Sequence, residues 1–516
     1  MTRKVPLMLI SICGVVAAAL PLASPASAAG TRTGAAAGQA GIAWKSCGKK
    51  FSRQLQCATV SVPLNWRRPH GTQIQLGVTR RLAPDQKHLI GSLFINPGGP
   101  GQSGVDIVQN PAQAAELSSW GDGRFNLVGW DTRGTHRSDP VRCFTSTASE
   151  DRFWRGLQIP VTPAQSRAYV PKVIELARRC GRVSGTLLDN ISSEDNARDL
   201  NRLRQLVGDR ALTYVGVSYG SVIGETYANL FPNRVRAMML DGVVDPILWT
   251  KSAEARVADH ISPTLPAFAQ FLKLCQAAGP ARCALARHAP LTAAQRVARL
   301  FRRARRAPIP APRANPAGVL TYSDLLLTTF QPMRSPLDWL QYARELDAAA
   351  SGNASALETA ARQFRMPANL SESTTSAAIQ CADGPARRPL SAWPAVMGHL
   401  TRVGPLWAPF LGWTNWAPCA ANWPGHPTER YAGPWNAKTK HPILLINNVF
   451  DPADSYTRAQ HVERLLGNAV LLTVHSWGHP SYALPSKCVD WWRGRYLVHL
   501  ITPPRGAVRQ TQRPFR

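Results

Sequence analysis

The sequence lacks the spacing of metal ligands. Its ten cysteines include no C-x-x-C pair, and cysteine and histidine residues are not grouped as they are in zinc sites. We therefore expect no metal site and no other cofactor. The sequence also contains no internal repeat that would divide its 516 residues into similar units.

Acidic residues are scarce: 31 Asp and Glu stand against 60 Lys and Arg, which gives a formal net charge of +29. Such a charge can attract nucleic acid or another acidic surface. The densest basic run, residues 302–306, is one face of an expected helix, and no aromatic residues are interleaved with it. We therefore expect the charge to be spread over a solvated surface and predict no nucleic-acid partner.

The apolar run near the start is shorter than the roughly 20 residues of a membrane-spanning helix. It covers residues 7–20, follows Arg3 and Lys4, and precedes the small residues 26–28. This order is typical of a secretory signal, which we assign to residues 1–28. We expect a secreted, extracellular protein with no membrane anchor.

Nine cysteines follow this signal, and in an exported chain they suggest disulfides. Cys47 with Cys57 and Cys275 with Cys283 are close pairs. The longer pairs that remain plausible are Cys143 with Cys180 and Cys381 with Cys419. Cys488 is then left without a partner.

The stretch around Ser218 combines a strand, a tight turn and a helix. A short β-rich run at residues 211–215 leads into residues 216–220, which read G-x-S-x-G. A helical pattern follows and ends before Pro232. The alternative is a plain glycine-rich turn, but the flanking strand and helix favour a nucleophile elbow, which exposes the serine hydroxyl above a sheet.

A second loop, INPGGPGQSG, follows a buried strand predicted at residues 90–95. A Gly/Pro loop after a central strand can present backbone N–H groups to an anion. The alternative is an ordinary turn. Because a nucleophile elbow is present in the same chain, we interpret the loop as part of an oxyanion hole.

A serine nucleophile needs a base and an acid that orients the base. His479 lies in a loop after a strand, and Asp451 follows the strand predicted at residues 443–449. Asp454 is the rival acid, but Asp451 leaves the strand directly and is preferred. The order Ser218, Asp451, His479 is the chain order of α/β-hydrolases.

The alternation of strands and helices is interrupted by a mainly helical block, which predicts an α/β-hydrolase fold with a helical cap inserted between the two halves of its sheet domain. An amphipathic helix in the block begins with the capping box Thr292 to Gln295. The expected divisions are a signal at 1–28, a flexible linker at 29–41, the first part of the core at 42–246, the cap at 247–400, the C-terminal part of the core at 401–501, and a frayed basic tail at 502–516.

Several motifs together resemble the exported tripeptidyl aminopeptidases, serine peptidases related to prolyl iminopeptidase. They span residues 42–497 and read QCATVSVPLNW, INPGGPGQSG, VGWDTRGTHRSDP, VGVSYGS, MMLDGVVDP, AIQCADGP, NNVFDPADS and WGHPSY. The resemblance implies an α/β-hydrolase fold with a helical cap, the triad Ser218, Asp451 and His479, and an oxyanion hole from the N–H groups of Gly99 and Tyr219. It also implies release of short peptides such as tripeptides from free N-termini, although relatives include esterases.

The chain departs from this family at two places. His136 stands where relatives usually have the second glycine of a D-x-R-G-x-G-x-S loop, which bears on the loop beside the active site. Relatives often pair the cysteine after the catalytic histidine with one near the C-terminus. Here the last 16 residues, ITPPRGAVRQTQRPFR, contain no cysteine, which leaves Cys488 free.

Three functions are compatible with these motifs: an aminopeptidase, a carboxylesterase with the same triad, and a non-catalytic binding protein on a hydrolase scaffold. We prefer the aminopeptidase, a monomer that acts on a peptide, with a small ester as the alternative substrate. An aminopeptidase needs a carboxylate for the substrate ammonium. The candidates are Asp383, which we prefer, and Glu254, Asp259 and Glu225. Within the loop at residues 131–140, Asp131 and Arg133 are expected to form an ion pair.

Overall fold

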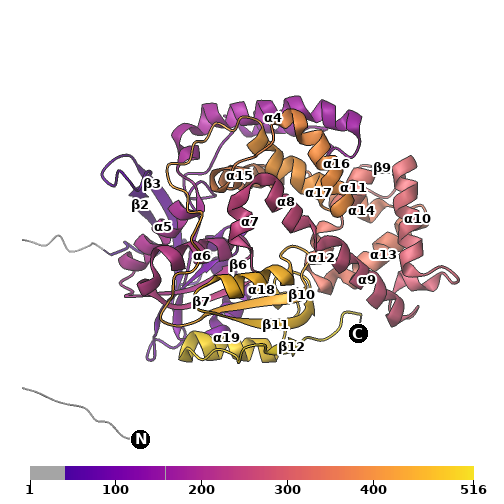
Figure 1. The fold of residues 1–516 in the computed structure, drawn as a ribbon. Helices are drawn as coiled ribbons and strands as arrows, with labels where there is room; N and C mark the ends of the chain where they lie inside the picture. Colours follow the sequence, from indigo (N-terminus) through magenta and orange to yellow (C-terminus); the bar gives the residue numbers. More distant parts are fainter. Residues whose placement is uncertain (1–40, 157, 516) are drawn as a thin grey trace, which may run out of the picture. The chain divides into compact units, whose positions relative to one another are not determined.

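The computed structural model describes residues 41–156 and 158–515 (Figure 1). The predicted signal at 1–28 and nearly all of the predicted linker at 29–41 lie outside these residues. Among the described residues, no helix combines the length and the apolar character needed to cross a membrane.

A ten-stranded sheet forms the centre of the fold, in the order β1-β2-β3-β5-β4-β6-β7-β10-β11-β12. The first strands pair antiparallel, as their alternating sequences predict, and all pairs from β5 to β12 are parallel. The strands are β1 (Lys45–Ser46), β2 (Leu55–Pro63), β3 (Gln73–Arg81), β4 (Gly91–Asn96), β5 (Phe125–Trp130), β6 (Leu212–Val217), β7 (Val235–Asp241), β10 (Ile443–Phe450), β11 (Ala469–Trp477) and β12 (Val508–Gln510).

Helices cover both faces of the sheet, so its central strands are buried on both sides. In β6, Tyr214 packs into one hydrophobic core and Val215 into the other, because successive side chains of a strand point to opposite faces. One core includes α5 (Ser193–Leu206), α6 (Tyr219–Leu230) and α18 (Tyr456–Leu465). The other includes α1 (Gly104–Gln109), α2 (Pro111–Trp120) and α19 (Lys487–His499), and Figure 1 shows α18 and α19 on opposite sides of the sheet.

A layer of helices lies between β7 and β10 in the sequence. It also contains a short two-stranded ribbon, β8 (Ile309–Ala311) and β9 (Gly318–Leu320), where only helices and loops were expected. Its helices are α7 (Pro246–Lys251), α8 (Ala253–Ile261), α9 (Thr264–Ala278), α10 (Ala293–Arg306), α11 (Tyr322–Leu327), α12 (Phe330–Arg334), α13 (Trp339–Ala350), α14 (Ser355–Phe364), α15 (Pro367–Asp383), α16 (Trp393–Val403) and α17 (Ala408–Leu411).

Local signals explain where these helices begin. The predicted capping box of α10 is present: Thr292 accepts from the N–H of Gln295, whose side chain accepts from the N–H of Thr292. The long helix α4 (Pro163–Ser184), which comes before β6 in the sequence, also packs against α16. The helical layer therefore includes residues from the first half of the chain.

The tail at 502–516 is more ordered than the sequence predicted. Residues 508–510 form β12, which pairs with the edge of β11, and Phe515 is only 5% exposed, with its ring 5.9 Å from that of Phe271. The prediction of a frayed tail is wrong, because a free strand edge and an aromatic cluster provide contacts that the tail sequence does not reveal.

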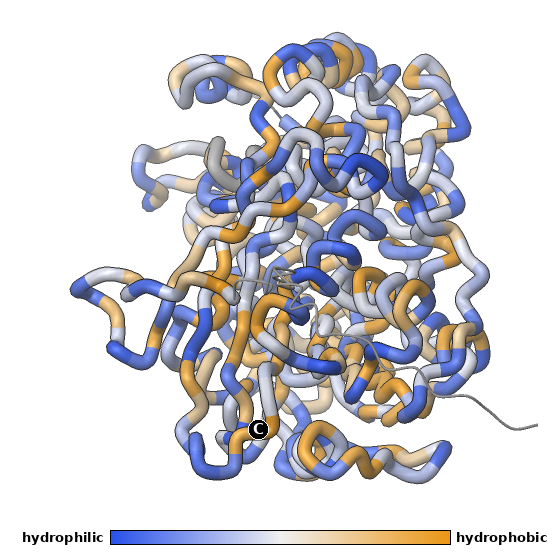
Figure 2. The backbone as a smooth tube through the Cα atoms, turned by 90° about the vertical axis from the view of Figure 1, so that its left-hand side faces the viewer, coloured by the Kyte–Doolittle hydropathy of each residue, from blue (hydrophilic) through white to orange (hydrophobic). Residues whose placement is uncertain are grey.

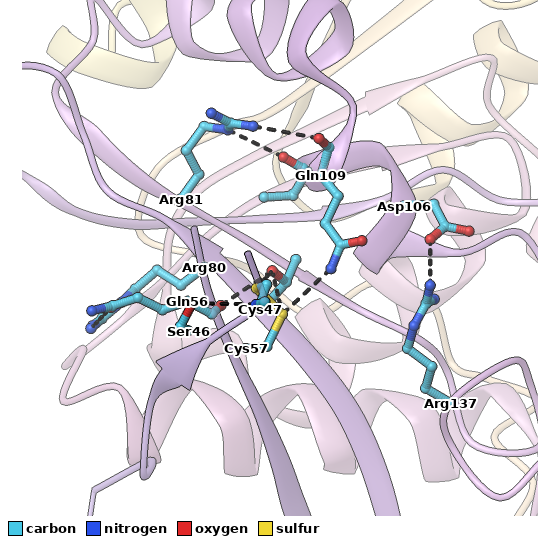
Figure 3. Close-up of a disulfide and its surroundings, with 12 residues drawn as sticks. Ser46, Cys47, Gln56, Cys57, Arg80, Arg81, Asp106, Gln109 and Arg137 are labelled. Carbon is cyan, nitrogen blue, oxygen red and sulfur yellow. Dashed lines mark hydrogen bonds and ion pairs between the residues drawn. A yellow bond between two sulfur atoms is a disulfide. The ribbon is translucent and has the colours of Figure 1, made fainter. Parts of the chain in front are cut away.

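All four predicted disulfides are present, and Cys488 is an exposed free cysteine. The bond between Cys47 and Cys57 joins β1 to β2 (Figure 3). The Gln109 side chain at the end of α1 donates to Cys57 Sγ at 3.4 Å. This link therefore ties the first strands to a helix that packs on the sheet.

Figure 2 shows hydrophilic stretches distributed through the whole view rather than gathered in one region. The side chains of the basic run in α10 are all exposed: these are Arg302, Arg303, Arg305 and Arg306.

Candidate active site

Ser218 occupies the turn between β6 and α6, as predicted for a nucleophile elbow. Its backbone has φ 55° and ψ −124°, a conformation that L-residues rarely adopt. A Cβ added at Gly216 would lie 2.4 Å from the Gly220 oxygen. A Cβ added at Gly220 would lie 2.6 Å from the Asn96 oxygen. The two glycines are therefore required by the close approach of strand, helix and neighbouring loop. Ser218 itself is 6% exposed.

His479 and Asp451 meet at the carboxyl ends of β11 and β10. The Nδ1–H of His479 donates to Asp451 Oδ2 at 2.8 Å. The other oxygen of Asp451 accepts from the N–H groups of Ala453 and Asp454 at 2.8 and 2.9 Å, which fixes the carboxylate. His479 Nε2 is buried and has no hydrogen-bond partner among the described residues, so it is free to accept from a hydroxyl.

The environment of His479 favours its protonated form. Burial lowers the pKa of the imidazole, but the charge and the hydrogen bond of Asp451, with the charge of Asp454, outweigh burial and leave the pKa raised. The imidazolium that forms when a base takes a proton is therefore stabilised here. One face of the ring lies against Gly242, where an added Cβ would be 2.7 Å from Cε1.

Asp454, the rival acid, lies close to the same histidine. Its Oδ2 is 3.6 Å from His479 Nδ1, beyond hydrogen-bonding distance, and has no hydrogen-bond partner among the described residues. Burial raises the pKa of Asp454 to about 7, and the nearby charge of Asp451 also raises it. Asp451, and not Asp454, is therefore the hydrogen-bond partner of His479 Nδ1.

The glycine-rich loop after β4 lies directly against the elbow. Gly98 and Gly99 have φ values of 96° and 105°. A Cβ at Gly98 would be 3.0 Å from Ser218 Cβ and 3.2 Å from Tyr219 N, so a side chain at this position is excluded. The Gly98 N–H donates to Asn96 Oδ1 at 3.0 Å. The loop therefore brings its backbone to the side of the serine where Tyr219 N lies.

His136 touches this same loop. Its backbone φ is 38°, which suits the glycine that relatives usually have there, and its Nε2–H donates to the Gly101 oxygen at 2.7 Å. Glu372 of α15 approaches from the other side: a Cβ at Gly101 would be 3.8 Å from Glu372 Cγ. Partial desolvation raises the pKa of Glu372, while the charges of His136 and Arg334 oppose the shift. Sequence reasoning did not single out Glu372, since nothing in its local sequence marks it.

The predicted ion pair between Asp131 and Arg133 is absent. Arg133 is buried and binds Asp199 of α5 at 2.6 Å, while Asp131 pairs with Arg137 at 3.2 Å. Asp131 also accepts from the Ser103 hydroxyl at 2.5 Å. The prediction is wrong because the two side chains leave the strand toward different helices, α5 and α1, which the local sequence does not show.

Asp383, the preferred carboxylate for a substrate ammonium, has its oxygens engaged. It accepts from the N–H and hydroxyl of Ser193 at 2.6 and 2.7 Å and from Trp249 Nε1 at 2.7 Å. It is 2% exposed. The geometry argues against a role in binding an amine, because the carboxylate already joins α5, α7 and α15.

The other three candidates differ in their surroundings. Glu254 accepts from the N–H groups of Arg387 and Arg388, and Asp259 pairs with Arg458 at 2.7 Å. Glu225 is fully buried behind the elbow, and neither of its oxygens has a hydrogen-bond partner among the described residues. Burial raises the pKa of Glu225 well above its usual range, which disfavours the charged carboxylate that an ammonium would need. None of the three offers a charged, unpaired carboxylate beside Ser218.

Comparisons with known proteins agree with this architecture. Residues 91–353 match the α/β-hydrolase fold family, and residues 404–509 match the family described as TAP-like protein. The chain is 30% identical to serine protease Hip1 of Mycobacterium tuberculosis over 98% of both chains. It is 31% identical to carboxylesterase B of the same species over 95% of both chains. It is also 35% identical to a tripeptidyl aminopeptidase of Streptomyces lividans over 41% of this chain and 40% of the relative.

Solved structures also include similar chains. One of them is MGS-M2, an α/β-hydrolase enzyme from a deep-sea metagenome library. The alignment covers 79% of this chain and 88% of MGS-M2, with 12% identity and a TM-score of 0.34. The family is shown by the sequence matches, which extend over nearly the whole chain. They confirm the fold class and the serine-hydrolase activity predicted from the sequence. The chain belongs to the TAP-like serine hydrolases of the α/β-hydrolase superfamily.

Proposed function

We propose that the protein is an exported aminopeptidase that releases short peptides, such as tripeptides, from free N-termini. In this proposal Ser218 is the nucleophile, His479 the general base and Asp451 the acid that orients it. The observation that carries the proposal is the 2.8 Å hydrogen bond from His479 to Asp451 in a site whose serine sits on a strained elbow. The three residues follow β6, β11 and β10, whose carboxyl ends lie at the same edge of the sheet.

The proposed reaction is acyl transfer. Ser218 Oγ attacks the substrate carbonyl while its proton passes to His479 Nε2. The imidazolium then gives this proton to the leaving amine, and water, deprotonated by the same nitrogen, releases the acyl group and restores the serine. Asp451 holds the Nδ1–H tautomer and stabilises the imidazolium throughout.

In the same proposal, the N–H groups of Gly99 and Tyr219 bind the oxyanion of the tetrahedral intermediate. Two contacts support this assignment: the Gly98–Gly99 loop lies against Tyr219 N, and the Gly98 N–H is already bound to Asn96. Removing one such donor typically lowers turnover by ~10²–10³.

In a tripeptide-releasing enzyme the substrate ammonium lies three residues from the scissile bond and requires a carboxylate within reach of the active site, and we assign this role to Glu372. It belongs to the helical layer, reaches the loop at Gly101 and lies near His136. Asp383 is not assigned this role, because both oxygens of its carboxylate already accept hydrogen bonds from Ser193 and Trp249. The relative named carboxylesterase B favours a second candidate function, ester hydrolysis with the same triad and no amine site.

We further propose that the chain divides as its sequence pattern suggests, with a signal at 1–28, a core at 42–246 and 401–501, and a cap at 247–400. Four disulfides among the described residues support an oxidising, extracellular location. The proposed assembly is a monomer that needs no cofactor.

The decisive experiment compares peptide p-nitroanilides with free and with acetylated N-termini, beside short p-nitrophenyl esters. An aminopeptidase should prefer the free amine by a factor of roughly 10² or more, the equivalent of ~3 kcal/mol.

Glu372→Gln should raise KM for free peptides and leave ester turnover nearly unchanged, with Glu254→Gln as the matched control. Equal cleavage of free and acetylated peptides would establish the esterase instead. If a fluorophosphonate left Ser218 unlabelled, the proposed nucleophile would be wrong.

A further inference from the structure

The helical layer contains a cavity of 870 Å³ that takes no part in the proposed chemistry. This cap cavity is enclosed by the start of α4, the end of α10, α11 and α16, and neither Ser218, Asp451 nor His479 lines it. Buried apolar side chains, including Leu326, Met397 and Trp413, form part of its floor, and polar side chains such as Gln165, Ser323 and Thr401 also line it. The volume lies within the range of small-molecule sites, which are commonly apolar with a few polar groups at defined places.

Every charged residue that lines the cap cavity is an arginine. These are Arg305 and Arg402, both exposed, and the lining contains no aspartate, glutamate or lysine. Arg305 donates to the Tyr322 hydroxyl at 2.7 Å and lies 4.9 Å from the centre of its ring, so its position is fixed. Arg402 has no ion-pair partner among the described residues. The opening therefore has uncompensated positive charge above an apolar floor.

Gly398 of α16 indicates that the cap cavity is kept open. A glycine inside a helix costs about 1 kcal/mol relative to alanine, so its presence needs a reason. Packing provides none, because a Cβ at Gly398 would meet nothing within 4 Å. By contrast, a Cβ at Gly412 would be 2.3 Å from Met397 Sδ. Packing thus requires Gly412 but not Gly398, so a larger side chain at position 398 would project into open space at the cap cavity.

Trp413, which lines the cap cavity, lies in a stretch of unusual backbone conformation. Residues 412–416 form a π-helical turn after α17. Such turns are rare and occur frequently at functional sites, since they re-aim side chains that an α-helix would place elsewhere. Trp413 is buried and its ring lies 5.5 Å from that of Tyr169 in α4. The turn therefore places Trp413 among the residues that line the cap cavity.

We propose that the cap cavity binds an amphipathic carboxylate of the fatty-acid class. Its hydrocarbon tail lies along Gly398 against Leu326 and Trp413, and its carboxylate is held by Arg305 and Arg402. The apolar part of the lining suits the hydrocarbon tail, the two arginines suit the carboxylate, and the lining has no acidic residue that would repel it. The inference does not depend on which substrate Ser218 attacks.

The test is a calorimetric titration of dodecanoate into protein whose serine has first reacted with a fluorophosphonate, so that the active site is filled. One saturable site is expected, with dodecanol bound at least tenfold more weakly and dodecyltrimethylammonium not bound. Arg305→Gln combined with Arg402→Gln should weaken dodecanoate at least tenfold. The matched control, Arg302→Gln with Arg306→Gln, removes two exposed arginines that do not line the cavity and should leave the affinity unchanged.

Gly398→Leu tests whether dodecanoate binds in the cap cavity and not elsewhere on the protein. Leucine has room at this position and fills the cap cavity, so the variant should fold with an unchanged or higher Tm and lose dodecanoate binding. Gly398→Ala, which adds one methyl group, should keep it. The proposal is overturned if the three dodecyl compounds bind equally, if no saturable binding occurs, or if Gly398→Leu binds as the parent does.

Discussion

An arginine beside the sheet and the arginines at the end of α10 have opposite surroundings. Under the sheet's carboxyl edge, Arg133 is fully buried and donates to Asp199 and to three backbone oxygens. In the helical layer, the four arginines near the end of α10 are exposed, and Arg305 is the one that lines the cap cavity. A buried, fully bonded charge tolerates little change, whereas an exposed one can be replaced at small cost.

This difference indicates how the two regions serve a hydrolase. The strand ends carry Ser218, Asp451 and His479, with a buried hydrogen bond between the last two, and the helical layer presents exposed side chains at the cap cavity. We therefore expect substitutions at the strand ends to abolish turnover, and substitutions in the helical layer to change affinity or stability instead. The following predictions test this contrast.

Ser218→Ala should have the largest effect, a loss of turnover on the order of 10⁶, because the nucleophile is removed while the elbow remains. Hydrolysis of a p-nitrophenyl ester and the thermal unfolding of the variant provide the measurement. An unchanged Tm shows that the fold is intact. Appreciable turnover in the variant would mean that another residue attacks the substrate.

The two carboxylates beside His479 should differ sharply. Asp451→Asn should lower turnover by ~10⁴, because the asparagine N–H cannot hold the required tautomer. Asp454→Asn should retain most of the turnover, since Asp454 lies 3.6 Å from Nδ1 and makes no hydrogen bond to it. Steady-state rates of both variants at one pH decide the matter, and the reverse order would exchange the roles of the two acids.

The pH dependence of kcat/KM should reflect His479. The base is active when neutral, and Asp451 and Asp454 raise its pKa, so activity should fall as the pH drops through a midpoint above the usual 6.5. Asp454→Asn should move this midpoint to lower pH, because it removes a nearby negative charge. The raised pKa of His479 also affects folding. Its contribution to the free energy of unfolding is fully present below the unfolded-state pKa and is lost as the pH rises through the folded-state pKa. A profile unaffected by the substitution would contradict the coupling.

His136→Gly should lower turnover by about tenfold without weakening the fold. Glycine suits the φ of 38°, so the strain of a non-glycine residue, ~1 kcal/mol, is relieved. The Gly101 oxygen loses its hydrogen bond, however, and the loop beside Ser218 is less firmly placed. Turnover and Tm are measured together, with His136→Asn as the control that keeps a polar side chain. A fall in both quantities would indicate a purely structural role.

The Cys275–Cys283 disulfide joins α9 to the following turn in the helical layer, and its loss should change turnover least. Replacing both cysteines by serine should cost ~2–3 kcal/mol of stability in the loop-entropy model, with turnover within about twofold of the parent. Denaturant unfolding and ester hydrolysis test this. In the parent, alkylation of the folded, unreduced protein should label Cys488 alone among the described cysteines. A large loss of turnover would show that the helical layer positions the triad.

Much of this site could be predicted from the sequence, for a definable reason. The elbow is a local pattern, and the acid and base each follow a recognisable strand, so their chain order predicts that they meet. Contacts of buried polar groups are different. Asp383 binds Ser193, 190 residues away, and Arg133 binds Asp199 rather than Asp131. These partners are selected by how helices pack, and local sequence carries no sign of that choice.

The pairing of β7 with β10 has a consequence for how the protein acquires activity. Leu444 of β10 lies beside Met239 of β7, so two neighbouring strands are separated by the whole helical layer in the sequence. Synthesis proceeds from the N-terminus, and contacts between distant segments form slowly. Ser218 can therefore be in place on its elbow while Asp451 and His479 have yet to be made. If Ser218 is the nucleophile as proposed, the nascent chain carries it before the proposed base, and activity requires the strands that complete the sheet.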